Sequence, residues 1–126
     1  MQPAMSSRPE WDEYFLDIAE VVSTRASCPR ASCGTVIVDL DHRIVATGYN
    51  GAPRGAPDCL TVGCDIVDNH CLRTVHSELN ALLHARESVR GYTAYVYGHA
   101  GVCDRCRLHL NGAGIYMIIH RKGAGY

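Results

Sequence analysis

Two short groups of residues in this chain carry side chains that could bind a metal ion and activate water. His76 is followed two residues later by Glu78, and two residues separate Cys103 from Cys106. Histidine and cysteine are the ligands that zinc prefers, and three protein ligands leave a fourth position open to water. Glu78 is not needed to complete that ligand set, so its carboxylate is available for proton transfer beside the metal. The pattern therefore predicts a catalytic zinc centre.

Each of the two groups is ambiguous when it is taken alone. A Cys-x-x-Cys pair also occurs in redox proteins, and cysteines can simply pack in a core. A redox role for the cysteine pair would not explain the presence of His76 and Glu78. Both groups are also predicted to lie where a helix begins, and the partial positive charge of a helix N-terminus favours thiolates over thiols. The combination therefore favours zinc over redox chemistry or packed thiols.

Length and composition are those of an ordinary globular domain. The chain has 126 residues, of which 47% are hydrophobic and 20% are charged, so we expect one domain over residues 1–126 with a flexible leader over residues 1–9. The net charge of −1 offers no broad basic surface to a polynucleotide or an anionic membrane. The apolar runs are too short to span a bilayer. We expect neither a polynucleotide nor a membrane as partner.

The cysteine count indicates the compartment. The chain has seven cysteines, which is an odd number, and it begins with a polar stretch rather than a secretory signal. Such cysteines are more typical of metal ligands or reduced thiols than of a disulfide framework. We therefore expect a cytoplasmic protein.

Apolar periodicity predicts the elements that would position these residues. Aromatic and aliphatic side chains recur at three- and four-residue spacing near the N-terminus, which is typical of an amphipathic helix. Two strands follow at a spacing that favours an antiparallel hairpin, and the later strands alternate with helices, which favours parallel neighbours in one sheet. A long irregular segment is expected over residues 50–69. The predicted order is αββαβαβ, over residues 10–25, 35–38, 44–49, 73–87, 93–97, 103–112 and 115–119.

The chain resembles the zinc-dependent cytidine/deoxycytidylate (dCMP) deaminase family, and within it the dCMP deaminases. The His-x-Glu and Cys-x-x-Cys groups match the signature of zinc nucleobase deaminases. The match is most specific at Gly48-Tyr49-Asn50-Gly51-Ala52-Pro53 and between His70 and Ala81, and it extends over nearly the whole chain. The resemblance implies a cytidine deaminase-like α/β fold, with three layers (α/β/α), one mixed sheet and a C-terminal end shorter than that of most relatives.

The resemblance also implies an activity, the hydrolytic deamination of dCMP to dUMP and ammonia. His76, Cys103 and Cys106 would hold the catalytic zinc. Water activated there would attack C4 of the cytosine ring, while Glu78 would move protons to N3 and to the departing amine.

Three further positions match residues that contact the substrate in this family. Asn50 matches an asparagine that touches the nucleotide, although a turn residue after a strand is the alternative. Ser77 stands where the family usually has alanine, so its backbone rather than its hydroxyl is expected to touch the base. Arg30 is expected to hold the 5′-phosphate, and Arg54 is a second candidate for that role.

A second group of ligands is expected in and around the long irregular segment. Some relatives carry a structural zinc, and Cys28, Cys59 and His70 fall at matching positions. The fourth ligand could be Cys71 or Cys64. The alternative is a set of reduced, partly buried thiols.

Several features leave the substrate and the regulation open. The loop from Gly98 to Val102 is longer than in most relatives, and Val102 replaces a proline next to the base, so a nucleoside, a free base or another amino-heterocycle is the alternative substrate. His84 lies near a position that binds the regulator through an aromatic ring in some relatives, so control by dCTP is not implied. A non-catalytic, zinc-held binding domain is a further alternative, against which Glu78 argues. As in the family, we expect a homo-oligomer, from a dimer to a hexamer.

Overall fold

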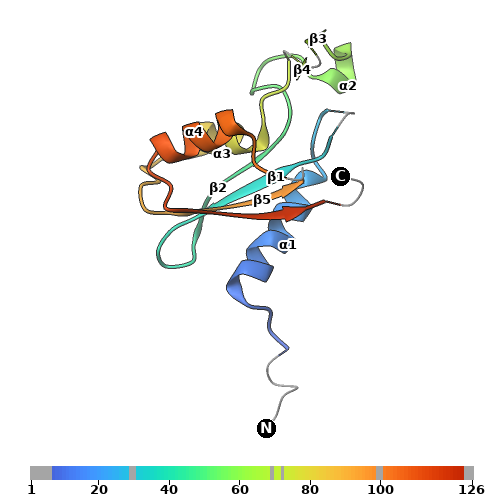
Figure 1. Ribbon diagram of the computed structural model, residues 1–126. Coiled ribbons are helices and arrows are strands. Elements are labelled where there is room, and N and C mark those ends of the chain that lie inside the picture. The colour runs from blue at the N-terminus through green and yellow to red at the C-terminus, as the bar shows by residue number, and fades with distance from the viewer. Residues whose placement is uncertain (1–6, 29–30, 69, 72, 99–100, 124–126) are drawn as a thin grey trace.

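The computed structural model describes residues 7–28, 31–68, 70–71, 73–98 and 101–123, with His70 and Cys71 described by their backbone alone. A four-stranded sheet lies at its centre, in the strand order β2-β1-β5-β6 (Figure 1). The strands are β1 (Gly34–Val38), β2 (Ile44–Tyr49), β5 (Thr93–Gly98) and β6 (Met117–Lys122).

The pairing of these strands makes the sheet mixed, as predicted. Strand β1 pairs with both β2 and β5 in antiparallel orientation. Strands β5 and β6 are parallel, and they are connected through helix α4 (Asp104–Gly112). Parallel neighbours need such a crossover, whereas the short segment between β1 and β2 permits a hairpin.

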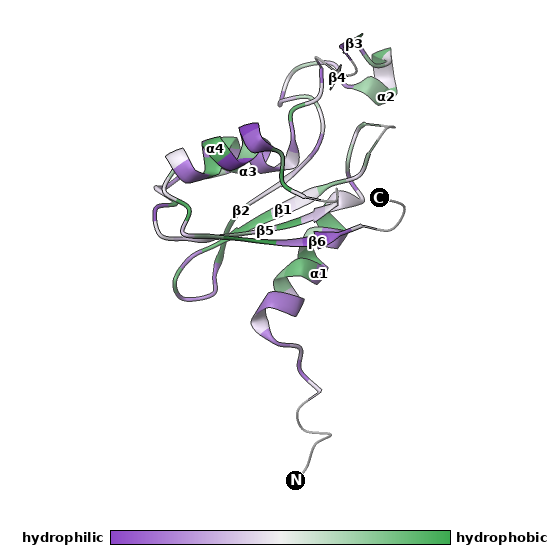
Figure 2. Cartoon of the chain, viewed as in Figure 1, coloured by the Kyte–Doolittle hydropathy of each residue, from purple (hydrophilic) through white to green (hydrophobic). Residues whose placement is uncertain are grey.

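Helices cover both faces of the sheet, which gives the predicted three layers (Figure 1). Helix α1 (Trp11–Ser23) lies on one face, and α3 (Ser77–His84) lies with α4 on the other. Strand β1 is buried along its whole length because alternate side chains enter two apolar clusters. Val36 packs with Phe15 on the side of α1, and Ile37 packs with Leu110 on the side of α4. Figure 2 shows the hydrophobic residues concentrated along the strands and on the helices beside them.

The long segment after β2 is more ordered than predicted. It contains the four-residue helix α2 (Cys59–Val62) and a small hairpin of β3 (Ile66–Val67) and β4 (His70–Cys71), which lie apart from the main sheet (Figure 1). Asp58 begins α2, since its carboxylate accepts a hydrogen bond from the Thr61 N–H at 2.9 Å. The prediction of an irregular segment over residues 50–69 is wrong in this part.

Several boundaries also differ from those predicted, and the starts of α3 and β6 are the ones with a clear cause. Helix α3 begins at Ser77 rather than residue 73, because Val75 is extended and forms two backbone hydrogen bonds with Gly51. Strand β6 begins at Met117 rather than residue 115, since Ile115 is still bonded to the last turn of α4 through Leu110. Among the described residues, no helix combines the length and the apolar character needed to cross a membrane.

Helix α3 lies directly against the backbone of β2 at Gly48. A Cβ atom added there would lie 2.3 Å from the Ala81 nitrogen and 2.5 Å from the Ser77 carbonyl oxygen. Both contacts are with backbone atoms, which cannot turn aside as a flexible side chain can. The approach of α3 to the sheet therefore depends on the missing side chain of Gly48.

We predict that Gly48→Ala displaces α3 and lowers the free energy of unfolding by about 1–3 kcal/mol, the usual cost of overpacking. Denaturant unfolding measures that change, and metal analysis of the same protein shows whether the start of α3 has moved. Gly112→Ala is the matched control, because an added methyl group meets nothing within 4 Å there. Equal stability of the two variants would contradict this account of Gly48.

Candidate metal centre and active site

The fold brings together the three residues that the sequence predicts as zinc ligands. The ligand atoms of His76, Cys103 and Cys106 all lie within 4.8 Å of one another. His76 Nδ1 lies 3.1 Å from the sulfur of Cys106 and 3.5 Å from the sulfur of Cys103. Tetrahedral zinc with ordinary bond lengths separates such ligand atoms by roughly 3.5–3.8 Å. The chemistry and the spacing of this group therefore fit a zinc ion.

Two helix starts create this geometry. His76 is the N-cap residue of α3, and Cys103 is the N-cap residue of α4. The sulfur of Cys103 accepts a hydrogen bond from the backbone N–H of Cys106 at 3.3 Å. Since α3 and α4 pack beside each other on the same face of the sheet, their positive ends meet at the ligand group (Figure 1). The predicted position of both groups at helix starts is confirmed.

The surroundings of the ligands differ on the two sides of the group. Cys106 is buried, whereas His76 and Cys103 are exposed, so the group is closed on one side and open to solvent on the other. Burial raises the pKa of the Cys106 thiol, and the neighbouring Glu78 carboxylate raises it further. A bound dication reverses this preference, because a coordinated thiol loses its proton. The open side leaves room for a further ligand such as water.

Glu78 lies next to the ligand group without belonging to it. It is buried in the first turn of α3, where the helix dipole favours a carboxylate. Its carboxylate is near enough to Cys106 to raise the pKa of that thiol further. Glu78 Oε1 accepts a hydrogen bond from the Ser77 hydroxyl at 2.9 Å. A carboxylate so placed can exchange protons with a molecule held at the open side of the metal group.

The other predicted substrate residues occupy different surroundings. Ser77 is fully buried, and its hydroxyl lies 2.8 Å from that of Thr35. Asn50 is also buried, where its Oδ1 accepts from the Cys33 N–H at 2.7 Å and its Nδ2 donates to the Ala31 carbonyl at 2.9 Å. Arg30 lies outside the described residues. The expected contacts of these three residues with a substrate stay predictions.

The second group of ligands also stays a prediction. Cys28 and Cys59 are both buried, and the sulfur of Cys59 lies 3.4 Å from the Thr74 hydroxyl. The side chains of His70 and Cys71 are not described. Within the part of the chain whose side chains are described, the three-residue group around His76 is the one cluster that could hold a metal.

Asn80 has a role that the sequence analysis missed. Its side-chain nitrogen donates to the Tyr49 carbonyl at 2.9 Å and lies 3.2 Å from the Gly51 carbonyl oxygen. These contacts join α3 to the end of β2 and to the Gly51–Val75 bridge, which leads into His76. The sequence feature that could have indicated this role is a polar residue in the first turns of the helix, directly before Ala81, which is buried. Asn80 therefore fixes the helix that carries His76 and Glu78.

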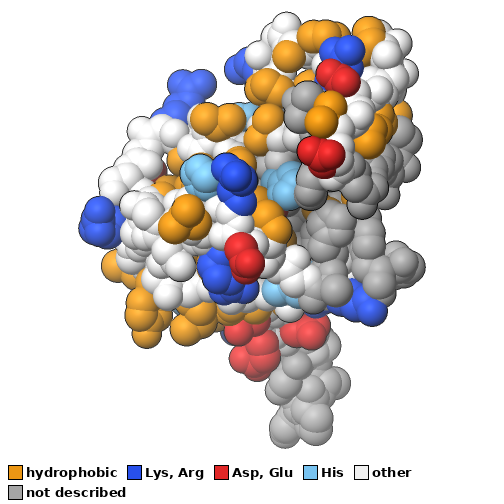
Figure 3. Space-filling view, turned by 45° about the horizontal axis from the view of Figure 1, so that its top comes forward, with side chains coloured by type: hydrophobic (Ala, Val, Ile, Leu, Met, Phe, Trp, Pro, Cys, Tyr) orange, Lys and Arg blue, Asp and Glu red, His pale blue; other side chains and the backbone are white. Residues whose placement is uncertain are grey.

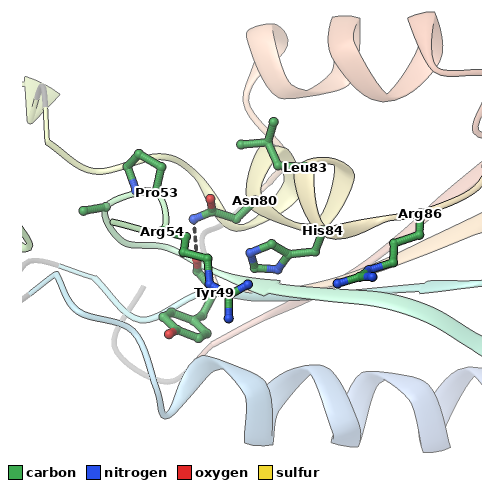
Figure 4. A pocket seen from close by; sticks show the side chains of 8 residues that line it. Tyr49, Pro53, Arg54, Asn80, Leu83, His84 and Arg86 are labelled. Carbon is green, nitrogen blue, oxygen red and sulfur yellow. Dashed lines mark hydrogen bonds between the residues drawn. The ribbon is translucent and has the colours of Figure 1, made fainter. Parts of the chain in front are cut away.

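A pocket of about 660 Å³ lies between α3 and the segment after β2, and none of the three metal-ligand candidates lines it. Figure 4 shows Arg54, His84 and Arg86 around this space. The Thr47 carbonyl can only accept, so His84 Nδ1 donates to it at 2.8 Å and Nε2 stays available. The remaining lining residues are Tyr49, Ala52, Pro53, Asn80 and Leu83. Arg54, the second candidate for the phosphate, thus lines a pocket to which none of the three metal-ligand candidates contributes.

Comparison with known proteins identifies the family. Residues 9–121 match the family described as "Cytidine and deoxycytidylate deaminase zinc-binding region". The chain is 39% identical to the deoxycytidylate deaminase of Mycobacterium phage D29, over 92% of this chain and 98% of that protein. It is 36% identical to ComE operon protein 2 of Bacillus subtilis, over 91% of this chain and 61% of that protein. The dCMP deaminase of cyanophage S-TIM5, solved with dCMP and dUMP, superimposes with a TM-score of 0.73 at 25% identity, over 97% of this chain and 84% of that one.

The fold and the converging His, Cys and Cys side chains define the class, which is that of zinc-dependent aminohydrolases. Within this class, the chain belongs to the cytidine and deoxycytidylate deaminase family. The resemblance inferred from the sequence is therefore confirmed.

We predict that Cys106→Ala removes one zinc equivalent per chain, because it deletes the buried ligand of the group. Metal analysis of the purified protein measures the stoichiometry. Cys33→Ala is the matched control, since Cys33 is a buried cysteine outside the group. About two zinc ions per wild-type chain would support the second site as well, and Cys106→Ala would then keep one. An unchanged zinc content in Cys106→Ala would contradict the assignment.

Proposed function

We propose that this protein deaminates a cytosine nucleotide by hydrolysis, converting dCMP to dUMP and ammonia. The observation that carries the proposal is the buried carboxylate of Glu78 beside a group of three zinc-type ligands with one open side. The family, and relatives named as deoxycytidylate deaminases, support the same reaction.

In this proposal, His76, Cys103 and Cys106 would hold the zinc, which when bound would supply the polarisation that makes water a nucleophile near neutral pH. Glu78 would take one proton from the attacking water as its oxygen adds to C4, and would give that proton to N3. Glu78 would then take the proton of the new hydroxyl group at C4 and give it to the amine. The C4–N bond would break as the C4 carbonyl forms, and ammonia would leave. General acid–base transfer of this kind contributes typically ~10²–10⁴-fold to a rate.

Substrate binding is assigned to three residues outside the metal group. We propose that Arg30 holds the 5′-phosphate, that Asn50 touches the nucleotide and that the backbone of Ser77 meets the base. Asn50 already uses its Oδ1 and one Nδ2 hydrogen within the protein, so the second Nδ2 hydrogen would make this contact.

One observation favours keeping a second candidate substrate. Val102 is buried and packs in the apolar cluster with Cys106 and Leu110. The loop that ends at Val102 is the one expected next to the base, and Val102 stands there in place of the proline that the family resemblance implies. A nucleoside, a free base or another amino-heterocycle is the alternative substrate.

We predict that ammonia release is fastest with dCMP when cytosine, cytidine, deoxycytidine, CMP and dCMP are compared at equal concentration. The reason is that a 5′-phosphate adds charge-assisted contacts which the nucleosides lack. Equal rates with deoxycytidine and dCMP would contradict the nucleotide assignment and favour the alternative.

The Glu78→Ala variant serves as the control that shows whether the measured ammonia release depends on the proposed proton shuttle. We expect this variant to keep its fold and its zinc, because Glu78 is not a ligand, and to lose turnover by at least ~10²-fold. Circular dichroism and metal analysis check the first two points. Retained turnover would remove Glu78 from the mechanism.

We further propose that the protein is cytoplasmic and works as a homo-oligomer. Large apolar side chains are exposed on α3, on α4 and just before β6, with Leu83 at 67%, Leu108 at 70% and Tyr116 at 76%. Figure 3 shows hydrophobic side chains spread over the face in view, among basic ones. Side chains of this size would lose their contact with water if this face were covered in an assembly, which stabilises the assembly.

We predict a sedimentation mass of two to six chains at micromolar concentration, and a smaller species when Leu108→Lys places a charge on the exposed side of α4. Val21→Lys is the matched control, because Val21 is equally exposed at 67% but lies on α1. A monomeric wild-type protein would contradict the proposed assembly.

A further inference from the structure

Two buried hydroxyl groups lie beneath the proposed proton shuttle. Thr35 on β1 and Ser77 at the start of α3 are both completely buried. Their side-chain oxygens lie 2.8 Å apart, and the Ser77 oxygen lies 2.9 Å from Glu78 Oε1. The three side chains thus form a continuous hydrogen-bonded row from the sheet to the carboxylate.

The chemistry of the groups gives this row a direction. An ionised carboxylate can only accept, so the Ser77 hydroxyl donates its single hydrogen to Glu78. The Ser77 oxygen must then accept from Thr35, whose hydroxyl donates. Each of the two hydroxyl groups therefore has a hydrogen-bond acceptor, and the last acceptor in the row is Glu78 Oε1.

Packing alone does not require these hydroxyl groups. The next residue of β1 on the same face is Ile37, which lies in the apolar cluster below α3 and α4. A valine has nearly the shape of Thr35 without the polar atom, and burying a polar group costs free energy unless it is paired.

We infer that Thr35 and Ser77 are positioning residues that fix the orientation of the Glu78 carboxylate. The last torsion of a glutamate side chain is broad and roughly two-fold, so an unheld carboxylate samples many orientations. A hydrogen bond from Ser77 to Oε1 restricts this rotation and leaves Oε2 as the oxygen that exchanges protons with water and substrate. Holding a reacting group in one geometry lowers the barrier because less freedom is lost during the reaction. The inference rests on the proposed role of Glu78.

The test uses Ser77→Ala, Thr35→Val and the double variant in steady-state kinetics with dCMP. We expect Ser77→Ala to lower kcat about tenfold, a part of the ~10²–10⁴-fold that general acid–base transfer supplies. KM and zinc content should stay unchanged, because neither hydroxyl touches the open side of the metal group. Thr35→Val should lower kcat by a smaller factor and should have no further effect once Ser77 is alanine. Thr35→Ser, which keeps the hydroxyl, should restore kcat.

Ser23→Ala is the matched control, since Ser23 is a buried serine on α1 whose hydroxyl bonds only to the Glu20 carbonyl among the described residues. We expect it to leave kcat unchanged. A wild-type kcat in Ser77→Ala would overturn the inference. The inference would also be overturned if the decrease in kcat of the double variant equalled the product of the decreases in Thr35→Val and Ser77→Ala. Such a result would mean that the two hydroxyl groups act independently.

An unfolding measurement separates this inference from the proposed function. In Ser77→Ala, the Thr35 hydroxyl is buried without its Ser77 partner. Adding Thr35→Val to this variant should therefore raise the unfolding midpoint. In the wild-type background, Thr35→Val should lower the unfolding midpoint. If the wild-type protein deaminates none of the compounds, the proposed function fails while this coupling can still be seen. If the change in unfolding midpoint of the double variant equals the sum of the changes in the two single variants, the inferred hydrogen-bonded row is contradicted, whether or not the protein is active.

Discussion

The contact between helix α3 and strand β2 is the constraint on which the site depends. At Gly48 the helix lies on the bare backbone of the strand, and Asn80 ties the same helix to the strand's end. The Gly51–Val75 bridge then holds the residues just before the helix in extended form, so that α3 starts at Ser77. His76 and Glu78 are therefore placed by backbone contacts together with one buried side chain, that of Asn80.

Helix α4 supplies the remaining ligands of the metal group. The parallel connection between β5 and β6 places α4 beside α3, and both helices start at the same point above the sheet. Cys103 and Cys106 enter the group from α4, while His76 enters it from α3. The positive ends of the two helices favour the thiolate of Cys106, which burial alone disfavours, and a bound metal ion would favour it further. Glu78 is buried beside this group, in the first turn of α3.

Much of this arrangement follows from patterns that are local in the sequence. The strand over residues 44–49 has the predicted bounds, and the ligands lie at helix starts as their spacing indicates. Elements of two to four residues, such as α2 and β3, carry too little periodicity to be predicted. The late start of α3 depends on Gly51, and the hydroxyl row joins Thr35 to a residue 42 positions later. Such contacts between distant residues leave no signal in the local pattern, so they emerge only from the fold.

The central claim is that water replaces the amino group of a cytosine nucleotide. The most direct measurement incubates the zinc-loaded protein with dCMP in heavy-oxygen water and analyses the nucleotide product by mass spectrometry. The account predicts dUMP with one heavy oxygen atom on the ring and one ammonia for each product formed. Unchanged dCMP, or dUMP without the heavy oxygen, would contradict it.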